Sequence, residues 1–300
     1  MIVPQSAQLG RMLQYVGRPL LFLIAYDIAI VFAYQVMHWH WMSFPNIPLA
    51  LLGSAIGVIM GFRNNSAYDR WWEARKLWGT IVNNSRSWAR QILQIEAVAD
   101  DDLLKFQRKM IYLHIAFVHA LRQHLRRLSP WDELERLLPP DEVQALRGDV
   151  NVPLRIQIQM GKLLRECARK HWIDPLQWAQ MDTTLNDLAD AQGGAERIKN
   201  TPMPKQYDYF PQLFTHIYCL VLPLALIDTL GWYTPLGSTL VGFIFLALDK
   251  IGRDLEDPFE NTIFDVPLTS ITRGIEINLR QLLNETDLPA LEKPAFGVLW

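Results

Sequence analysis

The 300-residue sequence predicts an all-α membrane protein, in which four transmembrane helices continue into a cytosolic helical bundle. Three observations support this fold class. Hydrophobic residues make up 50% of the chain and charged residues 20%, which fits a mixture of membrane spans and a polar domain. Four apolar runs occur, and lysines and arginines flank them on one side only. Between the second and third runs, apolar residues recur at helical spacing.

The apolar runs are taken in chain order. The first run, Pro19–Met37, is long enough to cross a bilayer, and "HWHW" follows it where a signal peptide would carry small residues. The second run, Ile47–Phe62, is short and passes into polar residues without a turn signal. The third and fourth runs cover about 209–227 and 234–248. The predicted domains are an N-terminal segment with two spans, a cytosolic helical region, two further spans and a cytosolic C-terminal segment, at 1–62, 63–205, 206–250 and 251–300.

The basic residues predict the orientation of the spans. They precede run one, follow run two, precede run three and follow run four, as Arg11, Arg18, Arg63, Arg70, Arg75, Lys76, Arg197, Lys199, Lys205, Lys250 and Arg253. The two remaining loops contain neither lysine nor arginine. The positive-inside rule therefore places both termini and the long central segment in the cytoplasm. Cys167 and Cys219 lie in unlike surroundings, so we expect no disulfide, and the net charge of −2 gives no sign of a nucleic-acid partner.

The central segment predicts a series of helices. "LLKFQRKMIYLHIAFVHALRQHLRRL" alternates apolar and basic residues at helical spacing, and "SPWDELERLL" has a Ser-Pro start with early acids. Pro139-Pro140 and "GDVNVP" mark breaks. Two more amphipathic helices are predicted at 151–172 and 174–198. No alternating strand pattern occurs, so this region continues the membrane helices as a bundle.

Glycines at every fourth position distinguish the second run. Gly53, Gly57 and Gly61 share one face of a helix. A glycine inside a helix costs about 1 kcal/mol relative to alanine, and close helix packing is its usual compensation in a membrane. The adjacent stripe is Ser54, Val58 and Phe62. This stripe faces either another surface, such as a central axis, or lipid and ordinary core.

Four blocks of sequence resemble the bestrophin family, in the order in which its bacterial members carry them. They are "GFRNNSAYDRWWEARKLWG" after the glycine stripe, "NTPMPKQY", "LPLALIDTLGWYTPL" and "LEDPFENTIFDVPL". The combination is more specific than any single block. The resemblance covers most of the chain, although about 98–192 matches only by position and helical character.

The resemblance implies a pentameric ion channel with one axial pore formed by five identical chains. Matched through "GFRNN", the residues of the hydrophobic neck are Ser54, Val58 and Phe62. Rings of valine and phenylalanine would gate by wetting and dewetting. Ser54 departs from the larger apolar residue expected there and makes the outer neck more polar. The glycines would then let the neck helices approach their neighbours.

A second constriction, a cytosolic aperture, falls on Met203 and Pro204 of "NTPMP". Lys205 follows where an apolar residue is expected, and a ring of lysines near an exit favours anions. Lys199 favours anions too, whereas Asp208 and Asp187 favour cations. Animal members bind calcium in an acidic run after the block matching "EDPF". Here only Glu260 and Asp265 follow that proline, so we expect no bound metal and no cofactor.

The resulting prediction is a channel for small monovalent ions, chloride favoured, in the bacterial inner membrane, with membrane lipid and the permeating ions as its other partners. The first alternative is a sodium-selective channel of the same fold. A transporter or a membrane-bound enzyme is a further alternative. No nucleophile, phosphate-loop or zinc-protease motif occurs and no paired broken helices are visible, so an enzyme is not expected.

A few other polar residues are candidate sites. His114, His119 and His124 are five apart and spread around a helix, so they do not predict a shared metal site. Asp27 lies inside the first run, where a charge is often functional. It either pairs with a neighbouring chain, lines a wet path or has a structural partner.

Overall fold

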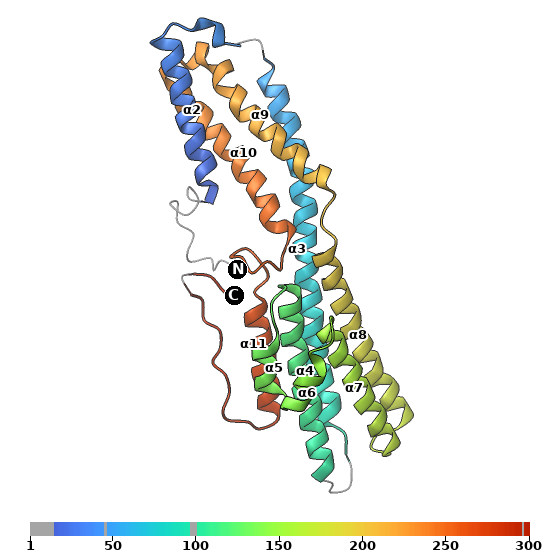
Figure 1. Ribbon diagram of the computed structural model, residues 1–300. Helices are drawn as coiled ribbons and strands as arrows, with labels where there is room; N and C mark the ends of the chain where they lie inside the picture. The colour runs from blue at the N-terminus through green and yellow to red at the C-terminus, as the bar shows by residue number, and fades with distance from the viewer. Residues whose placement is uncertain (1–14, 45–46, 97–100, 296) are drawn as a thin grey trace. The chain divides into compact units, whose positions relative to one another are not determined.

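The computed structural model describes residues 15–44, 47–96, 101–295 and 297–300, and it consists of helices (Figure 1). The helices are α2 (Arg18–Gln35), η2 (His40–Met42), α3 (Leu49–Leu93), α4 (Asp101–Leu125), α5 (Trp131–Leu137), α6 (Pro140–Leu146), α7 (Val152–Arg169), α8 (Pro175–Asn200), α9 (Lys205–Leu230), η3 (Gly231–Tyr233), α10 (Thr234–Glu256) and α11 (Leu268–Leu282). Within the described ranges, β-pairing is limited to an isolated bridge between Ala295 and Val298. The all-α prediction is confirmed. Arg11, used above for orientation, lies outside the described residues.

The described chain forms two compact units. The hydrophobic unit comprises 15–71 and Pro202–Asp257, and the amphipathic unit comprises Trp72–Thr201 and Pro258–Trp300. Helix α3 contributes its first part to the hydrophobic unit and its remainder to the amphipathic unit. The predicted domain boundaries follow the expected membrane edges instead of these divisions, and they stay predictions.

Helices α2, α9, α10 and the start of α3 form the hydrophobic unit (Figure 1). Among the residues that the structure describes, two segments are long and apolar enough to cross a membrane: α2 and the segment Lys205–Glu256, which contains α9, η3 and α10. They coincide with the predicted first, third and fourth runs. Large apolar side chains remain on their outer surfaces, with Leu21 67% and Leu240 61% exposed. Such surfaces suit a lipid environment, because lipid tails are as apolar as leucine.

Helix α3 joins the second apolar run and the polar run in one continuous element of 45 residues. At 1.5 Å per residue it is about 67 Å long. One stripe is buried along its whole length: Ile56, Met60, Arg63, Ala67, Ala74, Trp78, Ile81, Ser85, Trp88 and Ile92. The spacing of three and four residues is that of a helix packed on one face. The prediction that the glycine-rich run continues as helix into the polar run is therefore confirmed.

Helix α4 is the central helix of the amphipathic unit. Its residues from Met110 to Arg122 are buried almost without interruption, and it contacts α5, α7, α8 and α11. Gln107 also donates to the carbonyl groups of Ile92 and Ile95, both at 3.1 Å. A helix buried on all sides is expected at the centre of a bundle.

The remaining predicted helices of the central segment are found as α5, α7 and α8. Asp174 caps α8 in a reciprocal pair with Gln177, which satisfies two backbone amides at the helix start. The Pro139-Pro140 break is confirmed, and Pro140 also begins α6, because proline is tolerated in a first helical turn. Helix α11 lies in the C-terminal segment, where the sequence pattern does not predict a helix.

Candidate pore site

The stripe predicted to line the neck lies on the uncovered face of α3. Ser54 is exposed, Val58 is 59% exposed and Phe62 is 70% exposed. On the opposite side of the same turns, Ile56 and Met60 pack in one cluster with Tyr218 of α9. An apolar face left uncovered by its own chain is typical of a partner, lipid or pore surface. The Ser54 hydroxyl donates to the Ala50 carbonyl at 2.7 Å, so its donor is already used within the helix.

The three glycines of the predicted stripe on α3 have different surroundings. A Cβ atom added at Gly53 would lie 2.8 Å from the hydroxyl oxygen of Tyr218 on α9. At Gly57 and Gly61 no described atom lies within 4 Å of such a Cβ. Close packing at Gly53 therefore occurs inside the chain. A packing role for Gly57 and Gly61 stays a prediction, and it would need atoms from another molecule.

We expect Gly53→Ala to destabilise the protein by about 1–3 kcal/mol, because overpacking forces neighbouring side chains to shift. Tyr218 is only 8% exposed and cannot move freely into solvent. Gly79→Ala is the matched control, because Gly79 lies on the same helix and no described atom lies within 4 Å of a Cβ atom there; it should be neutral or stabilising by up to about 1 kcal/mol. The measurement is the apparent melting temperature in detergent. Equal destabilisation by both changes would contradict the difference between the two positions.

A buried charge cluster fixes the residue next to Phe62. The Arg63 side chain is 2% exposed; its Nη1 donates to Asp249 Oδ1 at 2.8 Å and to the Asp249 carbonyl at 3.2 Å. Its Nη2 pairs with Asp208 in the first turn of α9. Asp249 is fully buried on α10, and its Oδ2 lies 2.7 Å from Arg253 Nη2. Arg63 thus ties α3 to both α9 and α10.

Close packing of α3 against the backbone of α10 supports this cluster. Asn64 Nδ2 donates to the Leu248 carbonyl at 2.9 Å. A Cβ atom at Gly252 would lie 2.3 Å from Asn64 Oδ1 and 3.3 Å from Arg63 Cζ, so only glycine fits there. The sequence predicts Arg63 only as one of the basic residues that orient the spans; it does not predict that Arg63 links α3 to α9 and α10. The available signal was a charge directly after one apolar run, with Asp249 directly after another.

The residues predicted for the aperture lie in the connection between α8 and α9. Met203 is half-buried, and Pro204 is the residue before the first helical residue of α9. Lys205 begins that helix, is exposed and forms no ion pair among the described residues. By contrast, Asp208 pairs with Arg63, and Lys199 lies 2.5 Å from Glu260. Next to the predicted aperture, Lys205 thus carries a positive charge that no described residue pairs with.

Asp27 has partners in its own chain. It is fully buried on α2 and accepts hydrogen bonds from Ser238 and, at 3.0 Å, from the Thr239 hydroxyl on α10. Pairing with a neighbouring chain or lining a wet path would both require access to its surface. The structure therefore supports the third possibility for Asp27, a structural role through partners in its own chain.

The three histidines of α4 face different partners. His114 lies 2.8 Å from the Ser85 hydroxyl, and His119 Nε2 lies 2.9 Å from Glu276 Oε2. His124 lies 3.6 Å from Glu196. Burial lowers the pKa of His114 to about 3, so it is neutral. Among the described residues, no group of three or more metal-ligating side chains converges.

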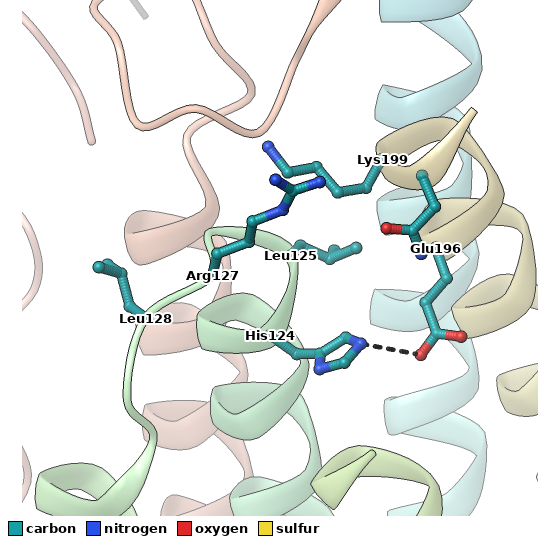
Figure 2. A pocket seen from close by; sticks show the side chains of 7 residues that line it. His124, Leu125, Arg127, Leu128, Glu196 and Lys199 are labelled. Carbon is teal, nitrogen blue, oxygen red and sulfur yellow. Dashed lines mark ion pairs between the residues drawn. The ribbon is translucent and has the colours of Figure 1, made fainter. Parts of the chain in front are cut away.

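A cavity of about 270 Å³ lies between the ends of α4 and α8 (Figure 2). It is lined by basic and acidic side chains together: His124, Arg127, Glu196 and Lys199. His124 contacts Glu196, and Lys199 pairs with Glu260. Most of its charges are thus compensated within the chain.

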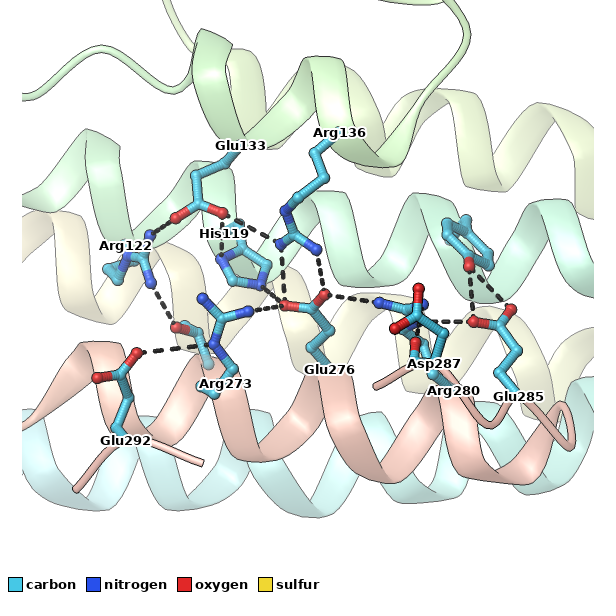
Figure 3. Close-up of polar contacts among 12 residues, drawn as sticks. His119, Arg122, Glu133, Arg136, Arg273, Glu276, Arg280, Glu285, Asp287 and Glu292 are labelled. Carbon is cyan, nitrogen blue, oxygen red and sulfur yellow. Dashed lines mark hydrogen bonds and ion pairs between the residues drawn. The ribbon is translucent and has the colours of Figure 1, made fainter. Parts of the chain in front are cut away.

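Glu276 on α11 is the centre of a second buried charge cluster (Figure 3). Its carboxylate is fully buried and contacts His119 at 2.9 Å, Arg273 at 3.1 Å and both terminal nitrogens of Arg136. Burial alone would raise the pKa of Glu276, but hydrogen bonds from His119 and Arg136 outweigh it and hold that pKa well below its usual range. Burial also lowers the pKa of His119. The cluster joins α4, α5 and α11 around an ionised carboxylate.

Comparison with known proteins gives one consistent result. The family described as Bacterial/Fungal Bestrophin protein matches residues 5–281. A voltage-dependent anion channel-forming protein of Ralstonia nicotianae is 34% identical over 276 residues, which cover 90% of this chain and 88% of the relative. One from Escherichia coli K12 is 33% identical over 284 residues, covering 94% and 91%.

A solved structure agrees with this match. The crystal structure of a bacterial bestrophin homologue from Klebsiella pneumoniae superposes with a TM-score of 0.83 at 31% identity, covering 89% of this chain and 97% of that one. Fold and hydrophobic unit thus define an all-helical membrane protein. The chain belongs to the bacterial and fungal bestrophin family, whose members are ion channels and not enzymes. The resemblance seen in the four sequence blocks is confirmed.

Proposed function

We propose that the chain is one subunit of a homopentameric channel that conducts small monovalent anions, with chloride favoured. The observation that carries the proposal is the uncovered face of α3, on which Val58 and Phe62 are 59% and 70% exposed. A single chain with one such face cannot enclose a pore, whereas five copies around an axis can. The names of the Ralstonia and Escherichia relatives support anions as the permeating species.

The proposed topology has four spans, namely α2, the first part of α3, α9 and α10, in the bacterial inner membrane. The basic residues support a cytoplasmic location for both termini and for the amphipathic unit. The part of α3 before Arg63 is shorter than the other spans. It would cross the membrane as the inner wall of an assembly, where neighbouring subunits shield it.

In this proposal Phe62 and Val58 form the hydrophobic neck, and Ser54 widens its more polar outer end. Gly57 and Gly61 would face a neighbouring subunit, since no described atom of the same chain lies near them. Met203 and Pro204 would form the aperture. The unpaired Lys205 would favour anions there, because Asp208 and Lys199 are each compensated by a partner.

The test is current across a planar bilayer in a salt gradient. Phe62→Ala should widen and wet the neck, raising conductance or open probability. Ile59→Ala is the matched control: Ile59 directly follows Val58 on the same helix, so it points about 100° away from Val58. It is 41% exposed, and its truncation should leave conductance unchanged. Unchanged conductance in Phe62→Ala would remove that residue from the constriction.

The same recordings separate the remaining possibilities. A wild-type reversal potential close to the chloride equilibrium potential supports the proposal. Lys205→Glu should shift the reversal potential towards the cation equilibrium potential. A reversal potential on the sodium side would instead favour the cation channel of the same fold. Transport without single-channel steps would favour a carrier, and a monomer in detergent would exclude the axial pore.

A further inference from the structure

The hydrophobic unit contains a cavity of about 360 Å³ between α2, α9 and α10. Its size is within the range of small-ligand pockets, about 300–1,000 Å³. The lining residues are Arg18, Pro19, Phe22, Leu23, His216, Cys219, Leu220 and Leu246. Two of them are basic and none is acidic. The cavity is therefore an apolar groove with a positive rim.

The two basic side chains have unused hydrogen-bonding capacity. Arg18 is exposed and forms no ion pair with any of the residues that the structure describes. His216 is exposed on α9, and its Nδ1 donates to the Gln212 carbonyl at 2.7 Å. That bond leaves Nε2 directed elsewhere. An ionisable side chain on the outer surface of a membrane helix is costly unless it finds a polar partner.

The start of α2 adds to the positive potential. Arg18 is the first residue of this 18-residue helix, where the backbone amides and the helix dipole favour an anion. The first turn of α2 contains no acidic residue. The rim thus combines a guanidinium, an imidazole and a helix N-terminus, and it attracts negative charge.

The walls below this rim are apolar. Leu23, Cys219 and Leu246 are 3%, 4% and 7% exposed and form the floor. Phe22 and Leu220 are 65% and 40% exposed and stand along the open side. A hydrocarbon chain laid between them would exchange lipid contacts for packing against a fixed surface.

We propose that this groove binds an anionic phospholipid, with its phosphate on Arg18 and His216 and one acyl chain along Phe22, Leu220 and Leu246. The site rests on the proposed function only in that α2, α9 and α10 span the membrane. A free phosphate would meet the rim but not the walls, and a neutral lipid would meet the walls but not the rim. The combination selects a molecule that carries both.

The experiment uses the full-length protein, purified in a neutral detergent and stripped of lipid. Phosphatidylglycerol or phosphatidylcholine is added in mixed micelles, and bound lipid is counted by native mass spectrometry. We expect phosphatidylglycerol to bind at least about tenfold more tightly. We expect the double variant Arg18→Gln, His216→Gln to lose about tenfold or more of this affinity, as expected for one lost charge-assisted hydrogen bond. Phe22→Ala should weaken both lipids.

Arg169→Gln is the matched control, because this exposed basic residue belongs to α7 of the amphipathic unit. It should bind phosphatidylglycerol like the wild type. Equal binding of the two lipids, or wild-type binding by the double variant, would overturn the proposal. So would displacement of the lipid by millimolar inorganic phosphate, which would make the site one for free phosphate.

A changed oligomeric state in the double variant would also overturn the proposal, since the groove would then be a contact between copies of the chain. The proposed channel function is read independently in the same preparations, as current in a bilayer. Specific lipid binding without any current would leave the lipid site standing and reject the channel. Current without a preference for phosphatidylglycerol would support the channel and reject the lipid site.

Discussion

Arg63→Gln is expected to destabilise the protein by about 3 kcal/mol and to abolish most of the channel current. Breaking a buried ion pair by removing one partner typically costs about 3–5 kcal/mol, because the other charge is left uncompensated. Here Asp249 is fully buried but keeps Arg253, so the lower end of that range applies. Arg63 also holds the first turn of α9 through Asp208, so the helices that carry the proposed neck and the proposed aperture should lose a shared contact.

Arg253→Gln is the control for this change. It removes the other basic partner of the same carboxylate, but its side chain is 39% exposed. A pair of this kind contributes less than about 1 kcal/mol. The measurements are apparent melting temperature and oligomeric state in detergent, followed by current in a bilayer. If Arg253→Gln lowered the melting temperature as much as Arg63→Gln, the claim that the buried Arg63 contributes more to stability than Arg253 would be wrong.

The features that the sequence predicts well are local. Pro19–Met37 and the two later apolar runs are recognised by composition alone, and they appear as α2, α9 and α10. The continuity of α3 follows from the absence of any turn signal between Phe62 and the polar run. Helical periodicity likewise predicts α4, α5, α7 and α8, because neighbours three and four apart must share a face.

The features that the sequence does not predict depend on distant contacts. Arg63 and Asp249 are 186 positions apart, and His119 and Glu276 are 157 apart. Each residue taken alone reads as an ordinary surface charge or a lone histidine. The glycine spacing shows the same limit, because it treats Gly53 and Gly57 alike. Only packing reveals that the first meets Tyr218 and the second meets no described atom of the chain.

Glu276→Gln should cause the largest loss of stability in the amphipathic unit, about 3–5 kcal/mol. The amide keeps the shape of the side chain but removes the charge. Arg136, Arg273 and Arg280 would then surround a neutral group at the position that Figure 3 shows. The hydrogen bond from His119 would also weaken. Because the chain is a membrane protein, the measurement is apparent melting at one fixed heating rate.

Glu292→Gln is the matched control for this prediction. Glu292 lies 3.7 Å from the same Arg273, but its side chain is 34% exposed, whereas Glu276 is fully buried. We expect its effect to remain below about 1 kcal/mol. Similar losses in the two variants would show that burial of Glu276 does not matter.

The pH dependence gives the prediction a sign. The pKa of Glu276 is depressed in the folded protein because hydrogen bonds from His119 and Arg136 outweigh its burial. A carboxylate with a depressed pKa stabilises the folded state above its unfolded pKa of 4.5, and this contribution disappears as the pH falls towards the folded value. The difference between wild type and Glu276→Gln should therefore be complete at neutral pH and shrink on acidification below the unfolded pKa. A difference that grows on acidification would show that the cluster does not hold Glu276 in its ionised form.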